Sequence, residues 1–237
     1  MDADELLRKY AAGERDFRNA ILRELDLIGV SLKSADFGRA DLRQARLGKT
    51  DFRQATFREA DLSETILWGA DLSDADLYRA ILREADLSGA KLMQAGLNEA
   101  NFNKASLCGA NLTGANLNAT QLFEADLRPS SDQRTDLGFA ILTNADLSYA
   151  ELSATLLHHA NLEGAKLCRA NLSQRAQWGG AATDLSEACL RRADLSYADL
   201  SGAILRKADL RSADLTGTIL TDADLQGAIM PDGTVHE

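Results

Sequence analysis

Residues 85–117 read ADLSG AKLMQ AGLNE ANFNK ASLCG ANLTG ANL, and this stretch decides the fold. Every fifth residue is Leu or Phe, and the residue two positions before it is Ala. A period of five matches neither the helical period of about 3.6 nor the strand period of about 2. Within one unit, however, Ala and Leu point to one side and the residue between them to the other. This is the alternation of a short extended segment.

The same five-residue unit runs through most of the chain. Its apolar centre recurs from Phe17 to Leu127, from Leu137 to Leu172 and, after a shift of three residues, from Leu185 to Met230, which gives 41 centres. Of the residues two positions before a centre, 31 are Ala and seven are Thr, and the residue between is often Asp or Asn. The last two residues of each unit are polar or small, which suits a corner. Extended segments joined by identical corners must coil, and stacked coils bury the Leu and Ala inside.

The pairing of a small and a large residue sets the width of this interior. Aromatic residues make up only 5% of the chain, so a core built around large rings is not expected. Each buried Leu or Phe contributes about 1.5–3 kcal/mol. No single coil buries the centres alone, so the fold needs many coils in contact.

The repeat resembles the pentapeptide-repeat family over about residues 15–230. The resemblance implies an all-β solenoid, a right-handed quadrilateral β-helix with four units, or about 20 residues, in each coil. The 41 units then make about ten coils, and at ~4.8 Å between stacked strands the rod is roughly 50 Å long. Residues one coil apart stack, so Phe17, Phe37 and Phe57 are expected to form a ladder near the N-terminus.

The two ends of the repeat need separate covers, because a solenoid end exposes core side chains and strand edges. Residues 1–14 lack the repeat, and Asp2 can cap a short helix that Gly13 ends, so we expect an N-terminal helical cap. At the other end, Met230–Gly233 is typical of a turn that stops the repeat before a tail at 231–237. We expect no C-terminal helix, which leaves a monomer and a dimer through the C-terminal end both open.

Two interruptions break the repeat of this single domain, near 128–136 and 173–183. The first takes the place of one unit, and the second replaces two units plus three residues around Trp178. Both are expected to bulge from the side of the rod. Loops on a regular scaffold are either tolerated insertions or carriers of recognition. A Trp beside two Gly is a candidate for a binding hot spot.

The net charge of −10, from 36 acidic and 26 basic residues, disfavours a sequence-independent nucleic-acid binder. An acidic rod can instead mimic DNA, as the family resemblance implies for topoisomerase inhibitors. Duplex DNA carries a negative charge every ~1.7 Å, so a rod of this length would need roughly 30. The excess of negative charge here is only 10. It is also uneven, because residues 1–60 hold 12 basic and 11 acidic residues. DNA mimicry is therefore the weaker interpretation.

The expected location is the cytoplasm. No apolar run approaches the roughly 18 residues of a membrane span, and the acidic N-terminus lacks an export signal. Three cysteines are too few and too scattered for a disulfide scaffold. Cys108 and Cys168 should lie on the same side three coils apart, a separation of ~14 Å that is too long for a disulfide.

The sequence shows no constellation that predicts catalysis. The repeated Asp residues fall at a structural position, and Gly48–Thr50 lacks the earlier Gly of a phosphate loop. His158 and His159, the only internal histidines, fall at the two corner positions of one unit, and no second pair with metal-ligand spacing accompanies them. We therefore expect no enzyme activity, no cofactor and no metal.

Segments outside the repeat carry a finer resemblance, to family members that regulate heterocyst differentiation in filamentous cyanobacteria. This resemblance implies a non-catalytic protein-interaction scaffold that binds the HetR transcription regulator and counters its inhibitory peptide PatS. A DNA-mimicking gyrase inhibitor and an unassigned structural interaction protein are the alternatives. The segments are Tyr10–Gly13, Leu127–Ser131, Gln133–Gly138, Leu157–Asn161, Lys166–Asn171, Gln177–Gly179 and Ile229–Gly233.

The repeat does not indicate which residues bind, so we predict them from their position. The stacking of coils places Glu151 about one coil beyond the first interruption on the same side. The predicted binding residues are Arg128, Asp132, Arg134, Glu151, His158 and His159, with Trp178 as a second candidate.

Overall fold

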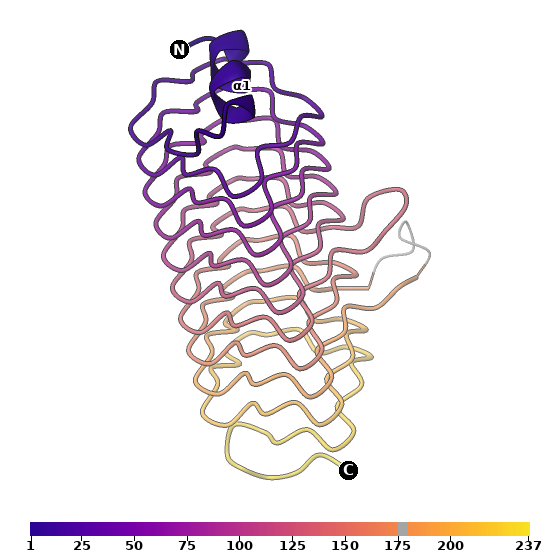
Figure 1. The fold of residues 1–237 in the computed structure, drawn as a ribbon. Helices are drawn as coiled ribbons and strands as arrows, with labels where there is room; N and C mark the ends of the chain where they lie inside the picture. The colour runs from indigo at the N-terminus through magenta and orange to yellow at the C-terminus, as the bar shows by residue number, and fades with distance from the viewer. Residues whose placement is uncertain (175–179) are drawn as a thin grey trace.

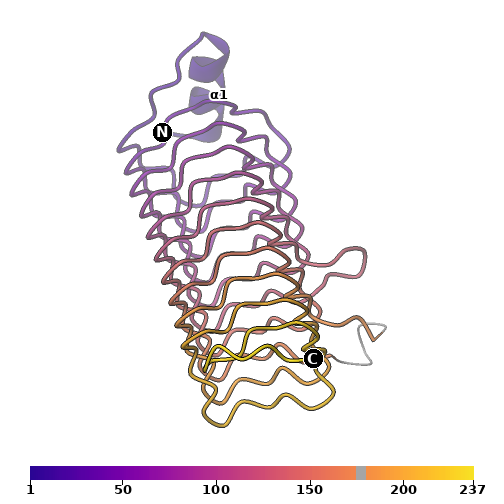
Figure 2. The ribbon, with the colours of Figure 1, turned by 90° about the horizontal axis from the view of Figure 1, so that it is seen from below.

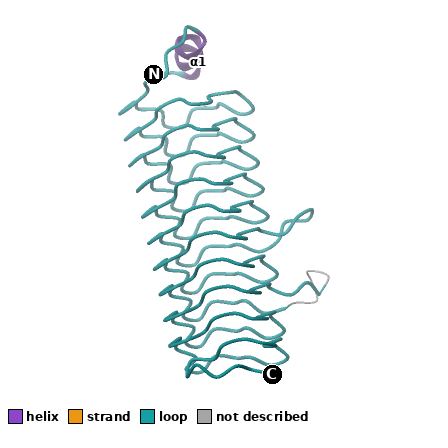
Figure 3. Cartoon of the chain, turned by 60° about the horizontal axis from the view of Figure 1, so that its bottom comes forward, coloured by secondary structure: helices purple, strands orange, loops and turns teal. Residues whose placement is uncertain are grey.

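The chain folds into a rod of stacked coils with one helix at its N-terminal end (Figure 1). The structure is a computed structural model that describes residues 1–174 and 180–237. Helix α1, Ala3–Ala11, is the one helix in these two ranges. The rest is drawn as loop in Figure 3, because its pairing consists of bridges one residue long. The solenoid is therefore held by many short parallel bridges.

Parallel bridges between successive coils form four rows along the rod, so each coil has four faces. Every residue in these rows stands directly before a Leu, Phe or Met centre, which confirms the five-residue unit as the building block of the coil. Face 1 runs from Asp16 to Ile229, face 2 from Ile21 to Asp214, face 3 from Asp26 to Ile219 and face 4 from Ser31 to Asp224.

The unit around Leu97 shows how one coil holds the next. The Leu97 amide donates to the Asn116 carbonyl of the following coil (2.7 Å), and the Asn116 amide donates back to the Ala95 carbonyl (2.9 Å). The chain then turns at Glu99, whose φ is 58°, and the Ala100 amide closes the turn on the Leu97 carbonyl (3.1 Å). Neighbouring coils thus satisfy each other's backbone polar groups, which buried backbone requires.

Where Asp or Asn stands before a centre, it holds the corner that follows. Its side-chain oxygen accepts the amide hydrogen two residues later, as in Asn101 with Asn103 (3.0 Å) and Asp146 with Ser148 (3.0 Å). This side-chain bond imitates a backbone turn, which is why Asp and Asn are favoured at such positions. The bond accounts for the ladder of Asp residues on the surface.

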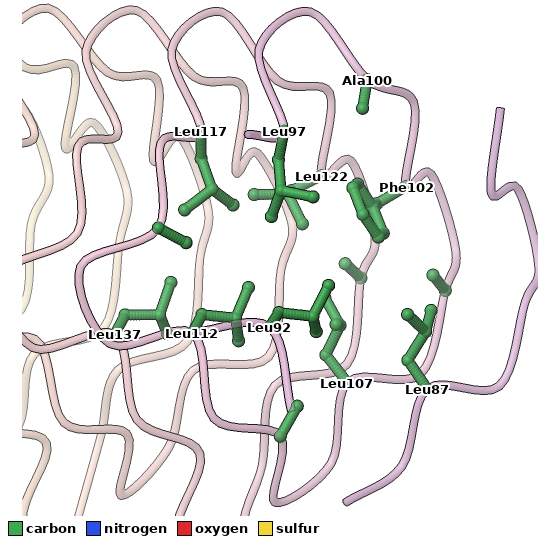
Figure 4. Close-up of a cluster of buried hydrophobic side chains, with 14 of the residues drawn as sticks. Leu87, Leu92, Leu97, Ala100, Phe102, Leu107, Leu112, Leu117, Leu122 and Leu137 are labelled. Atoms are coloured by element: carbon green, nitrogen blue, oxygen red, sulfur yellow. The ribbon is translucent and has the colours of Figure 1, made fainter. Parts of the chain in front are cut away.

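The interior is a column of Leu and Ala side chains that are closed to solvent. Figure 4 shows Leu137, Leu112 and Leu92 side by side in a row along the rod, and all three are fully buried. Each centre therefore packs against the centres of the coils above and below it. The column is continuous, as the small-large pairing predicts.

The predicted aromatic ladder near the N-terminus is confirmed. The rings of Phe17 and Phe37 are stacked with centroids 5.5 Å apart, and those of Phe37 and Phe57 with centroids 5.2 Å apart. Phe52 packs edge-on against Phe57 at 5.1 Å. These larger side chains fill the interior beneath the N-terminal cap.

Helix α1 covers the N-terminal end as expected. Asp2 caps it by accepting the Glu5 amide hydrogen (2.8 Å), and Leu6 is fully buried against the first coils. The Tyr10 hydroxyl donates to the Lys33 carbonyl (2.9 Å), which ties the helix to the rod. The helix shields core residues and strand edges that the first coil would otherwise expose. In the described part of the chain, no helix has the length and apolar content to cross a membrane.

The C-terminal end is covered less completely. After Met230 the chain turns back, with the Met230 amide donating to the Thr234 carbonyl (2.8 Å), and Val235 pairs antiparallel with Ile229. The predicted turn is therefore present, and the tail adds one bridge to face 1. Four centres of the last coils stay partly exposed, namely Leu215, Leu220, Leu225 and Met230.

The interruptions change the spacing of the coils that contain them. Lys91 bridges Asn111 at the regular spacing of one coil, but Asn111 bridges Asp136, one unit further along the chain than that spacing. The prediction that Cys108 and Cys168 lie on the same side is therefore wrong. The extra unit sets the later chain back by one face relative to an uninterrupted repeat, so Cys108 follows a face-3 residue and Cys168 follows a face-2 residue.

Replacing a central Leu should destabilise the rod far more than replacing one near the open end. We expect Leu97→Ala to lower the free energy of unfolding by about 2–5 kcal/mol, because the neighbouring coils cannot close the cavity. Leu225→Ala, the matched control, should cost about 1 kcal/mol, because part of that side chain is already in water. Urea denaturation followed by circular dichroism measures both, and equal losses would contradict the continuous core.

Acid should destabilise the rod through the corner carboxylates. Hydrogen bonds from the Arg18 side chain and amide lower the pKa of Asp16 to about 2, and hydrogen bonds from Thr216 hold the pKa of Asp214 below its ordinary value. A carboxyl whose pKa is lower in the folded chain than the unfolded value of about 3.9 stabilises the fold above that value. This stability disappears as the pH falls through the folded-state pKa. The urea midpoint should therefore decrease between about pH 4 and about pH 2.

Asp214→Asn provides the control for this acid effect. The amide oxygen can still accept the Thr216 amide hydrogen (2.9 Å from Asp214 in the native chain) but does not titrate. The variant should be nearly as stable as the native chain at neutral pH and lose less stability in acid. A loss in acid as large as that of the native chain would argue against a contribution from this carboxyl.

Candidate functional site

Both interruptions leave the rod at the same corner, between faces 3 and 4, and their described parts project to the same side in Figures 1, 2 and 3. We call this edge the loop corner. The first loop lies between Leu127 and Asp136, and the second lies between Leu172 and Asp184. One coil, at residues 152–155, separates them. Coil stacking thus brings together two irregular segments that are distant in sequence.

The first loop folds back onto the preceding coil at Gly109. Within the loop the Ser130 amide donates to the Gln133 carbonyl (2.9 Å), and the Gln133 side-chain amide donates to the Gly109 carbonyl. Gly109 has a φ of 66°, and a Cβ atom there would lie 2.5 Å from the Ser130 hydroxyl oxygen. Glycine is therefore needed twice, for its backbone conformation and for the close approach of the loop.

Arg134 connects the first loop to the second. Its guanidinium donates to the carbonyls of Ala154 (2.6 Å) and Thr155 (3.5 Å) in the intervening coil, and to the carbonyl of Ala182 in the second loop. The side chain is half-buried, and this desolvation lowers the pKa of Arg134 from its ordinary value. The predicted binding residue Arg134 thus acts within the fold as a clamp, because backbone carbonyls occupy its donors.

Buried threonines anchor the loop corner from inside. Thr135, Thr155 and Thr183 precede face 4 on successive coils and are fully buried. Their hydroxyls donate to backbone carbonyls left open at the corner, among them those of Leu127 (3.1 Å) and Leu152 (3.0 Å). Three of the seven Thr residues that replace the usual Ala therefore mark the coils around the loops, a signal that was present in the sequence.

Arg128 and Glu151 lie on the face-3 side of the loop corner. The Arg128 guanidinium forms a two-point pair with the Asp126 carboxylate (2.9 and 2.6 Å). Burial opposes ionisation of Asp126, but hydrogen bonds from the Arg128 side chain and amide outweigh it and hold the pKa of Asp126 below its ordinary value. Glu151 bridges Asp126 from the next coil and accepts the Asn171 side-chain amide (2.7 Å). Glu151 therefore lies one coil beyond Asp126 on face 3, beside the first loop, because the extra unit shifts it by one face from the position that 20-residue stacking predicts.

The two histidines lie at the next corner, between faces 4 and 1, together with Phe139 and Glu187. We call these four residues the histidine corner. The Phe139 ring stacks on His159 (4.8 Å between centroids) and meets His158 edge-on (5.4 Å). His159 Nδ1 lies 3.5 Å from a Glu187 carboxylate oxygen. Phe139 is 56% exposed. Phe139 is not among the predicted binding residues, although a large apolar residue at a normally polar corner position is a signal in the sequence.

The predicted binding residues are brought together only in part. Asp132 is exposed in the first loop, and the histidine pair lies across face 4 from it. Arg128 and Glu151 belong to the neighbouring face 3. Trp178 lies outside the described residues. The structure therefore shows two adjoining surfaces that meet at the loop corner, and face 4 lies between the first loop and the histidine corner.

This arrangement offers the chemistry of recognition. It presents an exposed ring, imidazoles, a carboxylate and irregular loops on a rigid support, which are features of protein-binding surfaces. Within residues 1–174 and 180–237, no group of three or more His, Cys, Asp or Glu side chains is arranged to hold a metal ion.

The fold and the repeat define the family. The family described as pentapeptide repeats matches in eight copies, within residues 16–48, 35–67, 55–94, 90–128, 134–174 and 193–230. The chain therefore belongs to the pentapeptide-repeat family, which implies a right-handed β-helix. The gaps between the matched ranges include the irregular segments of the loop corner.

Solved structures narrow the comparison. The chain is similar to HetL, a pentapeptide repeat protein involved in heterocyst differentiation regulation from the cyanobacterium Nostoc sp. strain PCC 7120, with 65% identity over 100% of both chains and a TM-score of 0.99. The protein alr5209 from Nostoc PCC 7120 is 37% identical over 44% of this chain and 80% of its own, with a TM-score of 0.40. QnrB1, a plasmid-mediated fluoroquinolone resistance protein, is 21% identical over 85% of this chain and 91% of its own, with a TM-score of 0.47. Among curated protein sequences, none matches.

Gly109→Ala should detach the first loop, whereas Gly89→Ala should not. Both glycines have a positive φ (66° and 65°), so each alanine costs about 1 kcal/mol in backbone conformation. A Cβ at position 89 meets only the Gln133 side chain, at 3.8 Å, but one at 109 collides with Ser130. We expect Gly109→Ala to lose about 1–3 kcal/mol more and to be cleaved faster by trypsin after Arg134. Equal stability and equal cleavage of the two variants would contradict this packing.

Proposed function

We propose that this protein is a non-catalytic scaffold that promotes heterocyst differentiation in the cytoplasm of a filamentous cyanobacterium. In this proposal it binds the HetR transcription regulator and counters the inhibitory peptide PatS. Binding acts either by covering the surface that PatS uses or by favouring a conformation of HetR with low affinity for the peptide.

The full-length match to HetL carries this proposal. Its 65% identity spans 100% of both chains, so it includes both ends and both interruptions as well as the repeat. Generic repeats are shared by proteins with different roles, and fold alone does not establish function. The irregular segments of the loop corner are the part of the chain in which a specific interaction is most readily encoded.

We place the HetR contact on face 4 between the first loop and the histidine corner. Asp132 borders this region on one side, and Phe139 with His158 and His159 borders it on the other. Leu156 lies on face 4 between them and is half-buried. An exposed ring held by a neighbouring imidazole can enter a partner's pocket with little loss of side-chain entropy, which is a property of binding hot spots.

Arg134 and Arg128 support this surface indirectly. Backbone carbonyls occupy the Arg134 guanidinium, and Arg128 is paired with Asp126. Reversing the charge of Arg134 would leave those carbonyls without a donor and would unfasten the loops. A loss of binding in such a variant would therefore indicate a changed loop structure, and it would not by itself show that Arg134 contacts HetR.

The corner arginines weigh against DNA mimicry. Asp41 pairs with both Arg23 (2.5 Å) and Arg43 (2.8 Å), and Asp209 pairs with Arg211 (2.6 Å). These carboxylates are neutralised within the protein, whereas the phosphates of a duplex present an uninterrupted row of negative charge.

Removing the exposed ring and its stacked imidazole should weaken HetR binding. We expect Phe139→Ser combined with His159→Ala to raise the dissociation constant at least tenfold, which corresponds to about 1.4 kcal/mol. Asn118→Ala, at the corner between faces 1 and 2, is the matched control and should bind as the native chain does. Isothermal titration calorimetry against HetR measures the affinities, and circular dichroism checks the fold. Unchanged affinity in a folded double variant would move the contact away from face 4.

A second pair of measurements separates the two functions. In the native protein, PatS peptide should compete with the chain for HetR, and a gyrase supercoiling assay should show no inhibition. Gyrase inhibition without HetR binding would replace the proposed function with that of a DNA mimic.

A further inference from the structure

The corner between faces 2 and 3 carries a different set of side chains in its C-terminal half. Phe123, Tyr149, Arg169 and Tyr197 lie there on four successive coils, because the residues two or three positions before them bridge one another along face 2. We call these four residues the aromatic corner. It lies diagonally across the rod from the histidine corner, so it belongs to a separate surface.

The four side chains contact one another in order. The Phe123 and Tyr149 rings meet at an angle with centroids 5.5 Å apart. The Arg169 guanidinium carbon lies 5.9 Å from the Tyr149 centroid and 5.3 Å from the Tyr197 centroid. The Tyr197 ring then lies against Gly217, where a Cβ atom would be 2.7 Å from ring atom Cδ1. A cation is thus held between two tyrosine rings.

Both interruptions are needed to assemble this ladder. Phe123 and Tyr149 are neighbours because the first loop adds a unit to the chain between the bridged residues Gln121 and Asp146. Arg169 and Tyr197 are neighbours because the second loop lengthens the chain between Lys166 and Asp194, which also bridge each other. In an uninterrupted repeat, Tyr149 would stand at a different corner from Phe123. The sequence spacing alone therefore does not reveal the ladder.

The tyrosines stand where the fold gives them little support. Tyr149 is 48% and Tyr197 is 56% exposed, although both are large rings. Their φ angles are 60° and 58°, a left-handed conformation that bulky residues adopt at a cost of about 1–2 kcal/mol. The next residue in the row, Gly217, occupies the same position without that cost. Most units place their second corner residue in this conformation, so it is the exposure of two large rings, and not their backbone, that sets these positions apart.

The charges beside the ladder are mostly negative. Asp146 and Asp194 on face 2 and Asp199 on face 3 each accept the amide hydrogen of their own corner. Among the described residues, no Lys or Arg lies within ion-pair distance of these three carboxylates. Lys166, between the first two on face 2, offsets one charge. This differs from the N-terminal half of the same corner, where Arg23 and Arg43 neutralise Asp41.

We propose that the aromatic corner binds a basic segment of a protein partner. Tyrosine faces attract guanidinium and ammonium groups through the ring quadrupole, and the flanking carboxylates add electrostatic complementarity. Arg169 shows within the protein that a guanidinium fits between these rings, and an incoming Arg or Lys uses the exposed faces that Arg169 leaves open. A nucleic acid is disfavoured because its phosphates would meet the carboxylates. This inference does not depend on the HetR proposal, because it concerns another corner and another ligand chemistry.

The test uses a fluorescein-labelled peptide of alternating Arg and Gly, with a peptide of alternating Glu and Gly as the charge control. We expect Tyr149→Leu combined with Tyr197→Leu to weaken binding of the Arg peptide about tenfold in fluorescence anisotropy, because leucine keeps apolar bulk but removes the ring quadrupole. Tyr78→Leu is the matched control. Tyr78 also lies between two arginines, Arg58 at 4.6 Å and Arg79 at 4.9 Å, but at the corner between faces 1 and 2. This variant should bind the peptide as the native chain does.

Two results would overturn the proposal. The first is native-like peptide binding by the folded double variant. The second is an equal loss in the double variant and in Tyr78→Leu, which would show that the peptide does not distinguish the aromatic corner from other exposed tyrosines. An independent measurement on the native protein covers the case in which the double variant fails to fold. Addition of the Arg peptide should shift the backbone amide signals of residues 147–149 and 195–197 in nuclear magnetic resonance spectra, and shifts confined to other corners would also refute the site.

Discussion

Stacking of each Leu centre on the centres above and below it is the interaction on which this molecule depends. The centres are fully buried only because neighbouring coils cover them, and the backbone amides of one coil find their acceptors on the next. Each coil is thus both the core and the hydrogen-bond partner of its neighbours, so stability is shared between adjacent coils along the rod. The same dependence explains the ends. Helix α1 closes the N-terminal coil, whereas a single antiparallel bridge at Val235 leaves the last centres partly exposed.

Because the interior is nearly the same in every coil, the features that distinguish one coil from another lie at the corners. A narrow column of Leu and Ala has no room for irregular chain, so both interruptions leave the rod at a corner, and Arg134 joins them there through backbone carbonyls. The first loop has a second effect that is less local. Its extra unit sets the later chain back by one face, and this decides which side chains become neighbours. Tyr149 reaches Phe123 through that shift. An insertion at the loop corner thereby determines which side chains lie together at the aromatic corner.

Much of the architecture could be read before any coordinates, because the repeat is local and strict. The five-residue period places every centre, the Asp or Asn position anticipates the corner hydrogen bond, and Asp2 with Gly13 marks the helix. The ladder of Phe17, Phe37 and Phe57 follows from uninterrupted spacing. The relation of Cys108 to Cys168 did not follow, because it spans the first loop. The site was less predictable still. Arg134 is a charged residue in a loop, which suggests binding, and only its hydrogen bonds to backbone carbonyls show that it holds the loops together. Phe139 is one of many exposed corner residues, so the sequence alone does not distinguish it.

Periodicity is sufficient to specify a coil wherever each residue interacts in the same way with its neighbours, and here that covers the fold, the buried column and the N-terminal cap. It does not specify how many residues of an interruption lie outside the coil. A segment of five residues keeps the five-residue register whether it forms part of a coil or projects from it as a loop. That number depends on contacts between distant segments, such as the Ser130 turn against Gly109 and the carbonyls that receive Arg134. The grouping of side chains into the loop, histidine and aromatic corners was therefore settled in three dimensions, by how the two loops pack against the rod.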